Sequence, residues 1–296
     1  MGNWLGHVGS GFFFLIWASW WVLQLSFNTL RNKYERDGRA GVPSRPLRLC
    51  RRIPLEGIII CLCTAFGFIA ENMYPYTRWK MFDEEGNFIE ANVWQHCTIW
   101  VAFWIFGLVK ILAACCCVNL KPWIPVFRTF SFFIQSIVFL NHLKDRDVLN
   151  TKLHVLLLIA ILLCVLFSGM EIWMKKDKFL PFMRMWATFV NGTWLIQVGC
   201  ALYPIRTGRF QWKPDDQSVK FFTMIFAWHC IGNVISVVML YLIVAIAMKF
   251  TFGHKRGYSQ LEIGEDSDNE QRSDTMYLER LQGGNRSQNN WSDNSL

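Results

Sequence analysis

The sequence predicts an all-α fold, a bundle of seven transmembrane helices followed by a disordered C-terminal tail. The chain has 296 residues, of which 53% are hydrophobic, and it contains 25 phenylalanines and 15 tryptophans. This composition indicates lipid as the solvent. Seven apolar stretches reach about 18 residues or more, the length that a helix needs to cross a bilayer. None of them alternates between apolar and polar residues as the strand of a membrane barrel does.

The predicted spans follow one another along the first five-sixths of the chain. The first span is expected to stay in the mature protein as a signal anchor, because no basic segment precedes it and no small-residue cleavage site follows it. The seven spans are Gly11–Thr29, Pro54–Asn72, Val93–Cys115, Trp123–Leu140, Leu153–Met174, Leu180–Tyr203 and Phe221–Met248. They define a membrane domain over residues 1–250, and residues 251–296 form the tail.

Lysine and arginine in the loops predict the orientation of the bundle. Eight of these residues lie between the first and second spans, and three more follow each of the fifth and seventh spans. The loop between the second and third spans contains the acidic run "DEEGNFIE". Because cytoplasmic loops are enriched in lysine and arginine, we expect the N-terminus outside or in the lumen and the C-terminus in the cytosol. The same rule explains the formal net charge of +8, and nucleic-acid binding is not expected.

The cysteines give a modification hypothesis at one helix end. None of the ten cysteines lies in the loops 73–92, 143–151 or 204–218, so a disulfide framework is not expected. Cys115, Cys116 and Cys117 stand at the cytosolic end of the third span, where cysteines are candidates for palmitoylation. The alternative is that they are only small apolar residues at a helix end.

The tail changes composition abruptly at Thr251. It is rich in glycine, serine, asparagine and charged residues and has few large apolar ones, which predicts disorder. Within it, "YSQL" from Tyr258 to Leu261 fits a tyrosine-based sorting signal, although motifs of four residues also arise by chance. The tail is therefore the predicted contact surface for trafficking adaptors.

Ionisable residues inside a membrane are costly and mark candidate functional sites. With the predicted orientation, five of the polar side chains in the outer half of the bundle form a candidate cluster: Glu71, His96, His154, Gln197 and His229. Imidazoles with a carboxylate are ligands for zinc or another transition metal, and without a metal they would respond to protons near neutral pH. Alternatively, each bonds only to a neighbouring helix. No close-spaced motif such as His-Glu-x-x-His supports a metal.

Residues at helix ends have a plainer interpretation. His7, His142 and His154, taken singly, are expected to face water or lipid headgroups. Nearer the cytosolic side, Lys110 and Glu171 each lie about 17 residues below the outer start of a span, so they are expected at equal depth. This predicts a possible ion pair between them, the alternative being a lysine that extends to the interface and an interfacial glutamate.

The chain resembles the transmembrane protein 45 family of multi-pass membrane proteins over roughly residues 1–250. The resemblance depends on separated motifs in the same order: "GNWLGH", "GFFFLIWASWW", "NVWQH", "GTWLIQVGCALYP" and "AWHC", with Glu71 and Pro75 between the second and third. The chain departs from the family at Ser10, usually a proline, and at Leu143 and Lys144, where the family tends to have histidines. The resemblance implies about seven helices and a place in the Golgi, endosome or plasma membrane, and it implies no biochemical activity.

These observations favour a non-catalytic membrane protein of the secretory and endosomal system with a trafficking, scaffold or regulatory role. Its partners would be the lipid bilayer and adaptors that bind the tail, and its polar pocket would lie in the outer half of the bundle. Two alternatives remain. One is a metal-dependent intramembrane hydrolase acting on a lipid, in which zinc would activate water, and the other is a proton-coupled transporter or channel. The sequence contains no complete catalytic motif and no convincing inverted repeat.

Overall fold

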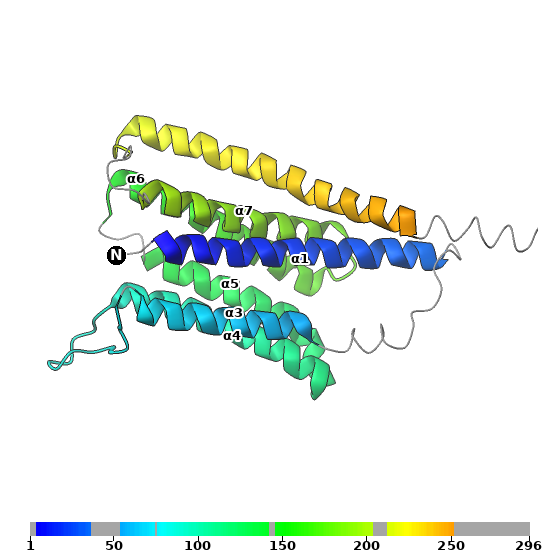
Figure 1. The fold of residues 1–296 in the computed structure, drawn as a ribbon, viewed down its shortest axis with the longest axis horizontal. Helices are drawn as coiled ribbons and strands as arrows, with labels where there is room; N and C mark the ends of the chain where they lie inside the picture. Colours follow the sequence, from blue (N-terminus) through cyan, green and yellow to red (C-terminus); the bar gives the residue numbers. More distant parts are fainter. Residues whose placement is uncertain (1–3, 37–53, 75, 142–145, 204–211, 252–296) are drawn as a thin grey trace, which may run out of the picture. The chain divides into compact units, whose positions relative to one another are not determined.

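The structure is a computed structural model that describes residues 4–36, 54–74, 76–141, 146–203 and 212–251. Within these residues the fold is all-α, with a single isolated β-bridge between Phe82 and Phe88. Figure 1 shows the helices α1 (Trp4–Arg36), α3 (Leu55–Met73), α4 (Ala91–Cys115), α5 (Ile124–Asn141), α6 (Val148–Trp173) and α7 (Phe179–Leu202), a short 3-10 helix η1 (Val118–Trp123), and an unlabelled last helix, Asp216–Thr251. Each predicted span overlaps one of the seven long helices.

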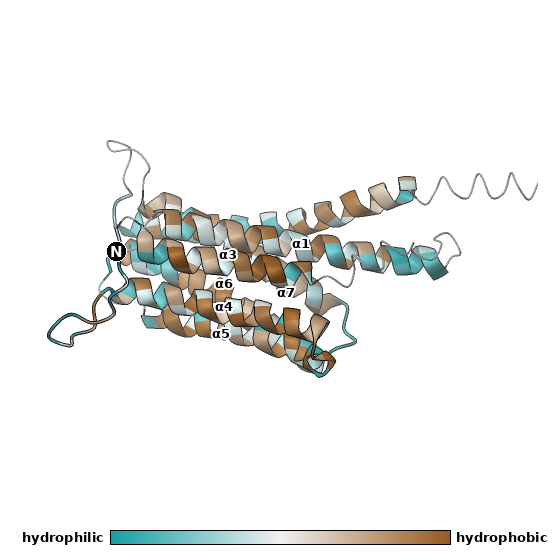
Figure 2. Cartoon of the chain, turned by 60° about the horizontal axis from the view of Figure 1, so that its bottom comes forward, coloured by the Kyte–Doolittle hydropathy of each residue, from teal (hydrophilic) through white to brown (hydrophobic). Residues whose placement is uncertain are grey.

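Six of the described helices are long and apolar enough to cross a membrane, so the predicted count of seven spans is matched only in part. Figure 2 shows their apolar middles between more polar ends. The exception is α7, whose hydropathy is lowered by Arg184, Asn191 and Gln197. Two of these side chains are buried inside the bundle, Arg184 at 8% exposure and Asn191 at 0%. The helix is therefore polar on surfaces that its neighbours cover.

The chain divides into two compact units, each described by itself. The main unit consists of residues 1–26 with 43–242, and it contains α3 to α7, the first part of α1 and most of the last helix. The second unit consists of residues 27–42 with 243–296, and in it Arg31 Nε contacts Glu35 Oε1 at 2.6 Å within α1. All of the candidate site residues discussed below belong to the main unit.

Neighbouring helices of the main unit pack in chain order, α3 on α4, α4 on α5, α5 on α6 and α6 on α7. Aspartates mark three of the helix starts by accepting bonds from free backbone amides. Asp147 accepts from Asn150 N at 2.9 Å at the start of α6. Asp177 accepts from Leu180 N at 2.9 Å at the start of α7, and Asp215 accepts from Ser218 N at 2.8 Å before the last helix. The hydrogen bonds from Ser218 hold the pKa of the Asp215 carboxyl below its ordinary value.

An aromatic core fills the centre of the main unit. We use this name for Phe14, Trp17, Phe103, Phe106 and Phe132, which come from α1, α4 and α5 and are at most 4% exposed. The Phe103 ring lies edge-on to Phe14 and to Phe132, with ring centroids 5.3 Å apart in both pairs. Such edge-to-face contacts add to the stabilisation from burial. The aromatic core divides the interior into an outer part, toward the start of α1, and an inner part.

The closest approach of α1 to α7 depends on two glycines. A Cβ atom on Gly11 would lie 2.7 Å from the backbone oxygen of Gly192 and 2.6 Å from Ile196 Cγ1. A Cβ atom on Gly192 would lie 2.9 Å from the backbone oxygen of Gly11. Small residues let the backbones of membrane helices approach in this way, because packing rather than hydrophobicity drives their association.

We expect Gly11→Ala to lower the free energy of unfolding of the purified protein by about 1–3 kcal/mol, because the added methyl group has no space against α7. Thermal unfolding in detergent measures this change. The matched control is Gly9→Ala, two residues earlier on α1, where an added Cβ atom meets nothing within 4 Å. Equal losses in the two variants would show that the α1–α7 contact is not the cause.

Candidate functional site

Four polar side chains from four helices meet near the outer end of the main unit. We call this set the outer polar layer: His7 of α1, Glu71 of α3, His96 of α4 and His154 of α6. His96 Nδ1 lies 3.2 Å from Glu71 Oε1, and His7 Nε2 lies 3.5 Å from His154 Nε2. The ring centroids of His7 and His96 are 6.5 Å apart, so the two pairs adjoin. His7 and His154 are buried, at 3% and 0% exposure, although both were expected to face water or headgroups.

The hydrogen-bond partners fix which ring nitrogens carry hydrogen. His154 Nδ1 lies 2.9 Å from the carbonyl oxygen of Asn150, which can only accept, so Nδ1 is the donor. In a neutral ring the other nitrogen, Nε2, then accepts, and His7 Nε2 donates to it. By the same reasoning His96 donates from Nδ1 to the Glu71 carboxylate. In this arrangement each ring of the neutral layer donates one hydrogen bond.

A closed rim and a small cavity border the outer polar layer. Above it, Arg78 donates from Nη2 to the backbone oxygen of Glu71 at 2.9 Å, and its Nη1 lies 3.7 Å from Glu90 Oε2. Below it, a cavity of about 30 Å³ is lined in part by His7, His96 and Gln135. A cavity of that size holds about one or two waters. Gln135 Oε1 is buried without a hydrogen-bond partner among the described residues, so it is a natural contact for such a water.

Gln197 and His229, which were also assigned to this cluster from the sequence, form no hydrogen bond with the outer polar layer among the described residues. His229 packs its ring edge-on against Trp194, with centroids 5.4 Å apart. Gln197, on α7, has no side-chain hydrogen bond within the part of the chain that the structure describes. His142 lies outside the described residues. Among the residues that are described, no group of three or more histidine, cysteine, aspartate or glutamate side chains is arranged to hold a metal ion.

A second polar group lies on the inner side of the aromatic core. Glu56, in the first turn of α3, pairs with Lys110 of α4 at 2.6 Å. The same carboxylate oxygen accepts from Trp21 Nε1 at 2.8 Å and from Trp17 Nε1 at 3.4 Å, both on α1. The two tryptophans thereby tie α1 to the α3–α4 pair.

Glu171 of α6 forms ion pairs with two arginines from neighbouring helices. Arg184 Nε of α7 lies 2.9 Å from Glu171 Oε1, and Arg128 of α5 pairs with Glu171 Oε2. The Arg184 guanidinium carbon stands 4.0 Å from the centroid of the Trp21 ring, a cation–π contact that joins this group to Glu56. We call the five charged residues, Glu56, Lys110, Arg128, Glu171 and Arg184, the inner charge network.

The predicted ion pair between Lys110 and Glu171 is wrong in its partners. Both residues are paired and partly buried, but Lys110 pairs with Glu56 and Glu171 pairs with the two arginines. Equal depth along the membrane does not fix the direction in which a side chain points around its helix. Arg128 and Arg184 were not singled out from the sequence, because each stands near the end of a span, where arginine commonly extends to the interface.

The inner charge network carries three cations against two carboxylates, a net charge of +1. Among the described residues, Arg128 Nε and Arg184 Nη1 are buried without a hydrogen-bond partner. A buried pair stabilises only when its remaining donors are satisfied, so these contacts serve position and specificity more than stability.

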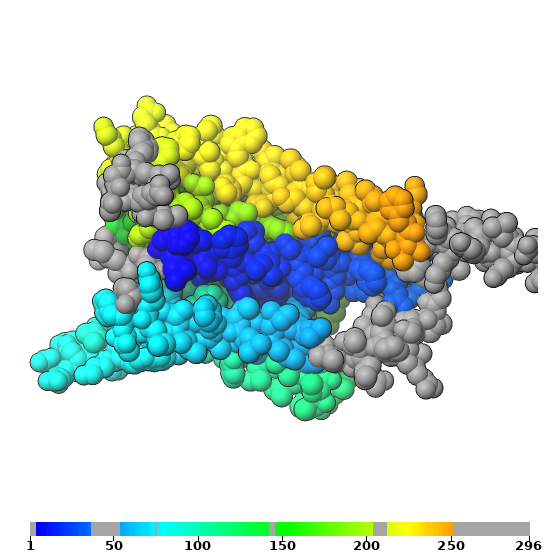
Figure 3. Space-filling model, in the orientation of Figure 1, coloured from blue at the N-terminus to red at the C-terminus, as the bar shows by residue number. Residues whose placement is uncertain are grey.

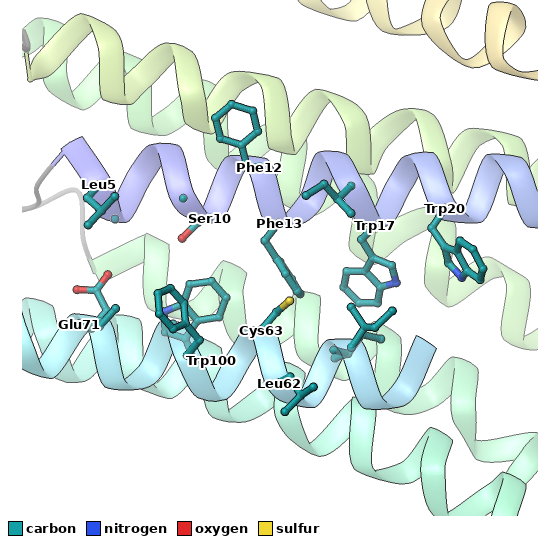
Figure 4. Close-up of a pocket in the computed structure, with 18 of the residues that line it drawn as sticks. Leu5, Ser10, Phe12, Phe13, Trp17, Trp20, Leu62, Cys63, Glu71 and Trp100 are labelled. Atoms are coloured by element: carbon teal, nitrogen blue, oxygen red, sulfur yellow. The ribbon is translucent and has the colours of Figure 1, made fainter. Parts of the chain in front are cut away.

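An apolar groove of about 580 Å³ lies between α1 and α3. Figure 3 shows the two helices side by side on one face, and Figure 4 shows Glu71 near one end of the groove and Trp17 and Trp20 toward the other. Its lining also includes Glu56, so the groove runs from the outer polar layer to the inner charge network.

The remaining sequence hypotheses are less constrained. Cys115, Cys116 and Cys117 are exposed at the end of α4, so their thiols are accessible. Tyr258 and Leu261 lie outside the described residues, as does nearly all of the predicted tail.

An all-α fold with six apolar helices of membrane length among the described residues, and polar groups gathered inside it, defines a multi-pass integral membrane protein. Residues 123–242 match a family of unknown function (DUF716). The chain is 26% identical over 151 residues to human transmembrane epididymal protein 1, covering 49% of this chain and 54% of that protein. It is 22% identical over 253 residues to mouse transmembrane epididymal protein 1A, covering 81% and 80%, respectively.

A third relative is rat transmembrane epididymal protein 1, 23% identical over 156 residues, with 52% of this chain and 51% of that protein covered. The chain thus spans about half the length of the human and rat relatives and four-fifths of the mouse relative. The matched family segment contains Arg128, His154, Glu171 and Arg184.

We expect Glu171→Gln to lower the free energy of unfolding by about 3–5 kcal/mol, because it leaves two buried arginines without their counter-ion. Thermal unfolding in detergent tests this. The matched control is Asp216→Asn, which removes an ion pair to Lys220 whose side chains are 78% and 68% exposed, and which should change little. A loss no larger than that of the control would contradict the role of Glu171.

Proposed function

We propose that this chain is a non-catalytic, seven-span membrane protein of the secretory and endosomal system whose outer polar layer responds to protons. The observation that carries this proposal is the contact of three imidazoles and one carboxylate from four helices in one buried layer. Histidine titrates near the pH range that separates the early from the late compartments of that system. A proton-dependent change in this layer would alter how α1, α3, α4 and α6 pack.

The span proposed in addition to the six apolar helices is α7, the sixth long helix in chain order. Its 24 residues extend about 36 Å, enough to cross a hydrocarbon core of about 30 Å. Within α7, Arg184 pairs with Glu171 and Trp194 Nε1 donates to the backbone oxygen of Leu153 at 3.0 Å, whereas both polar side-chain atoms of Asn191 are buried without a hydrogen-bond partner among the described residues. With seven spans, the basic loops predict that the N-terminus lies outside or in the lumen and that the tail lies in the cytosol.

The finer family assignment is part of the same proposal. The motifs of the transmembrane protein 45 family, together with the match to the family of unknown function and to the transmembrane epididymal proteins, support a member of that group. Residence along the Golgi, endosome and plasma-membrane route, and adaptor binding through the "YSQL" segment of the tail, follow from the resemblance and the motif.

The proton response follows from the charge of the layer. With all three rings neutral and Glu71 ionised, the layer carries a charge of −1. One proton taken up by the layer brings its charge to zero. A second proton, on His7, brings it to +1 in a buried site with no further carboxylate in the layer to offset it. The second proton therefore weakens the packing of α1 against α4 and α6.

Among the described residues, six titratable or charged groups surround His7 and set the electrostatics of this response. They are Glu71, Arg78, His96, Arg146, His154 and Tyr203. Two of them are arginines, which add to the repulsion when a second proton enters. The aromatic core blocks the direct path from the outer polar layer to the inner charge network, which favours a regulatory response over conduction of protons through the bundle.

Acidification from about pH 7.5 to about pH 5.5, on either side of the ordinary histidine pKa of about 6.5, should increase amide hydrogen exchange at the outer ends of α1 and α6. Hydrogen–deuterium exchange of the full chain in lipid nanodiscs measures this, with labelling times corrected for the pH dependence of the chemistry. Glu71→Gln should show the increase at a higher pH. Without the carboxylate, the first proton already gives the layer a positive charge that no other group in the layer offsets.

The matched control for this prediction is His229→Gln. This histidine lies on the last helix against Trp194, outside the outer polar layer, so its replacement should leave the wild-type response intact. A response that is absent in the wild type, or that His229→Gln removes and Glu71→Gln does not shift, would rule out the proposed element.

An epitope tag at the N-terminus should be detected on unpermeabilised cells, and a tag at the C-terminus only after permeabilisation. Tyr258→Ala should raise the surface signal of the N-terminal tag severalfold, because the sorting motif loses its aromatic residue. The control is Tyr277→Ala, since "YLER" has an arginine where the motif needs a large apolar residue. A C-terminal tag exposed on intact cells, or equal effects of the two tyrosine variants, would overturn the topology or the sorting role, respectively.

A further inference from the structure

The α1–α3 groove has the size and surface of a binding site for a lipid chain. Its volume of about 580 Å³ lies within the range of about 300–1,000 Å³ that is usual for ligand sites. Glu56 and Glu71 mark its two ends, and a rise of about 1.5 Å per residue separates them by about 22 Å along α3. A hydrocarbon core is about 30 Å thick, so the groove follows most of its depth.

The groove opens toward the outside of the bundle, on the side that would face lipid. Its rim is formed by exposed apolar side chains, such as Ile16 on α1 at 66% and Phe66 on α3 at 73%. The outer half of the α1 wall contains three small residues, Gly6, Gly9 and Ser10. A Cβ atom on Gly9 would meet nothing within 4 Å. The Trp100 ring of α4 lies against Gly67, where a Cβ atom would be 2.5 Å from it, and this ring forms part of the floor.

The two ends of the groove differ in what they offer a head group. At the inner end, Glu56 is occupied by Lys110, Trp17 and Trp21. At the outer end, Glu71 accepts from His96 through Oε1, and no contact to its Oε2 is found within the described ranges. Ser10 lines both the groove and the small cavity beside His7 and His96, so the two spaces adjoin. The outer end is therefore the end that offers hydrogen-bond acceptors.

From this geometry we infer that the α1–α3 groove binds a single-chain lipid with an uncharged hydroxyl head group, its tail along the groove and its hydroxyl at Glu71. The carboxylate accepts a hydrogen bond from a hydroxyl group and repels a phosphate. The apolar walls match an acyl chain, and the surrounding solvent supplies such chains. This inference goes beyond the proton response and shares only Glu71 with the outer polar layer; the tail site at Gly9 is separate from that layer, so labelling of the Gly9→Leu variant tests the groove by itself.

The test is photolabelling of the full chain in detergent at a fixed pH of about 7.5, with a monoacylglycerol that carries a diazirine in its acyl chain. Labelled peptides should come from residues 5–20 and 59–74. Gly9→Leu should reduce this labelling about fivefold, equivalent to about 1 kcal/mol, because it fills the groove from a position with space for the added atoms. Gly232→Leu, another glycine whose added Cβ meets nothing within 4 Å, lies outside the groove and should label like the wild type.

A second probe tests the head-group assignment. A lysophosphatidic acid with the same photoreactive chain should label the groove peptides weakly in the wild type and as strongly as the monoacylglycerol in Glu71→Gln. Should Gly9→Leu fail to fold, Cys63→Trp fills the groove from α3 instead. Undiminished labelling in both groove-filling variants, stronger labelling by the phosphate probe in the wild type, or crosslinks between the grooves of two copies would overturn the proposal.

Discussion

Charge burial in hydrocarbon is the constraint on which the rest of this structure depends. A charged side chain at mid-membrane is costly unless it finds a partner, and Glu171 provides one for arginines on two other helices, Arg128 of α5 and Arg184 of α7. The contact of Arg184 with Trp21 extends the group to α1, and Trp21 in turn bonds to Glu56 on α3. One set of pairings thus fixes the relative rotation of six helices, a degree of freedom that apolar packing alone leaves loosely specified.

The helices themselves could be predicted from the sequence, because length and hydropathy are properties of a single segment. Their ends were less predictable. The first span was expected over Gly11–Thr29, whereas α1 runs from Trp4 to Arg36, since a helix can continue into water beyond the apolar stretch. Depth along the membrane also follows from sequence, and it places Glu71 and His96 at one level. Direction around the helix axis does not, which is why His229 turned toward Trp194 and Lys110 toward Glu56.

The interior is organised as alternating polar and aromatic zones. The outer polar layer consists of three histidines and a carboxylate, whereas the inner charge network consists of arginines, a lysine and carboxylates in ion pairs. The aromatic core between them contains no titratable group among the five residues that define it. A change of protonation at the outer end can therefore alter helix packing there while the inner network keeps the same helices attached. Such a division suits a regulatory membrane protein better than a pore.

The polar character of α7 has a consequence for how the protein enters the membrane during synthesis. A helix that carries a buried arginine, as α7 carries Arg184 in its second turn, partitions less well from the translocon into lipid by itself. The turn before α7 is short, so α6 and α7 emerge as a hairpin in which Glu171 is already beside Arg184. Neutralised in this way, the pair can leave the translocon together. On the proposal that α7 spans the membrane, its insertion is then an assembly step, and it requires α6 to have been made first.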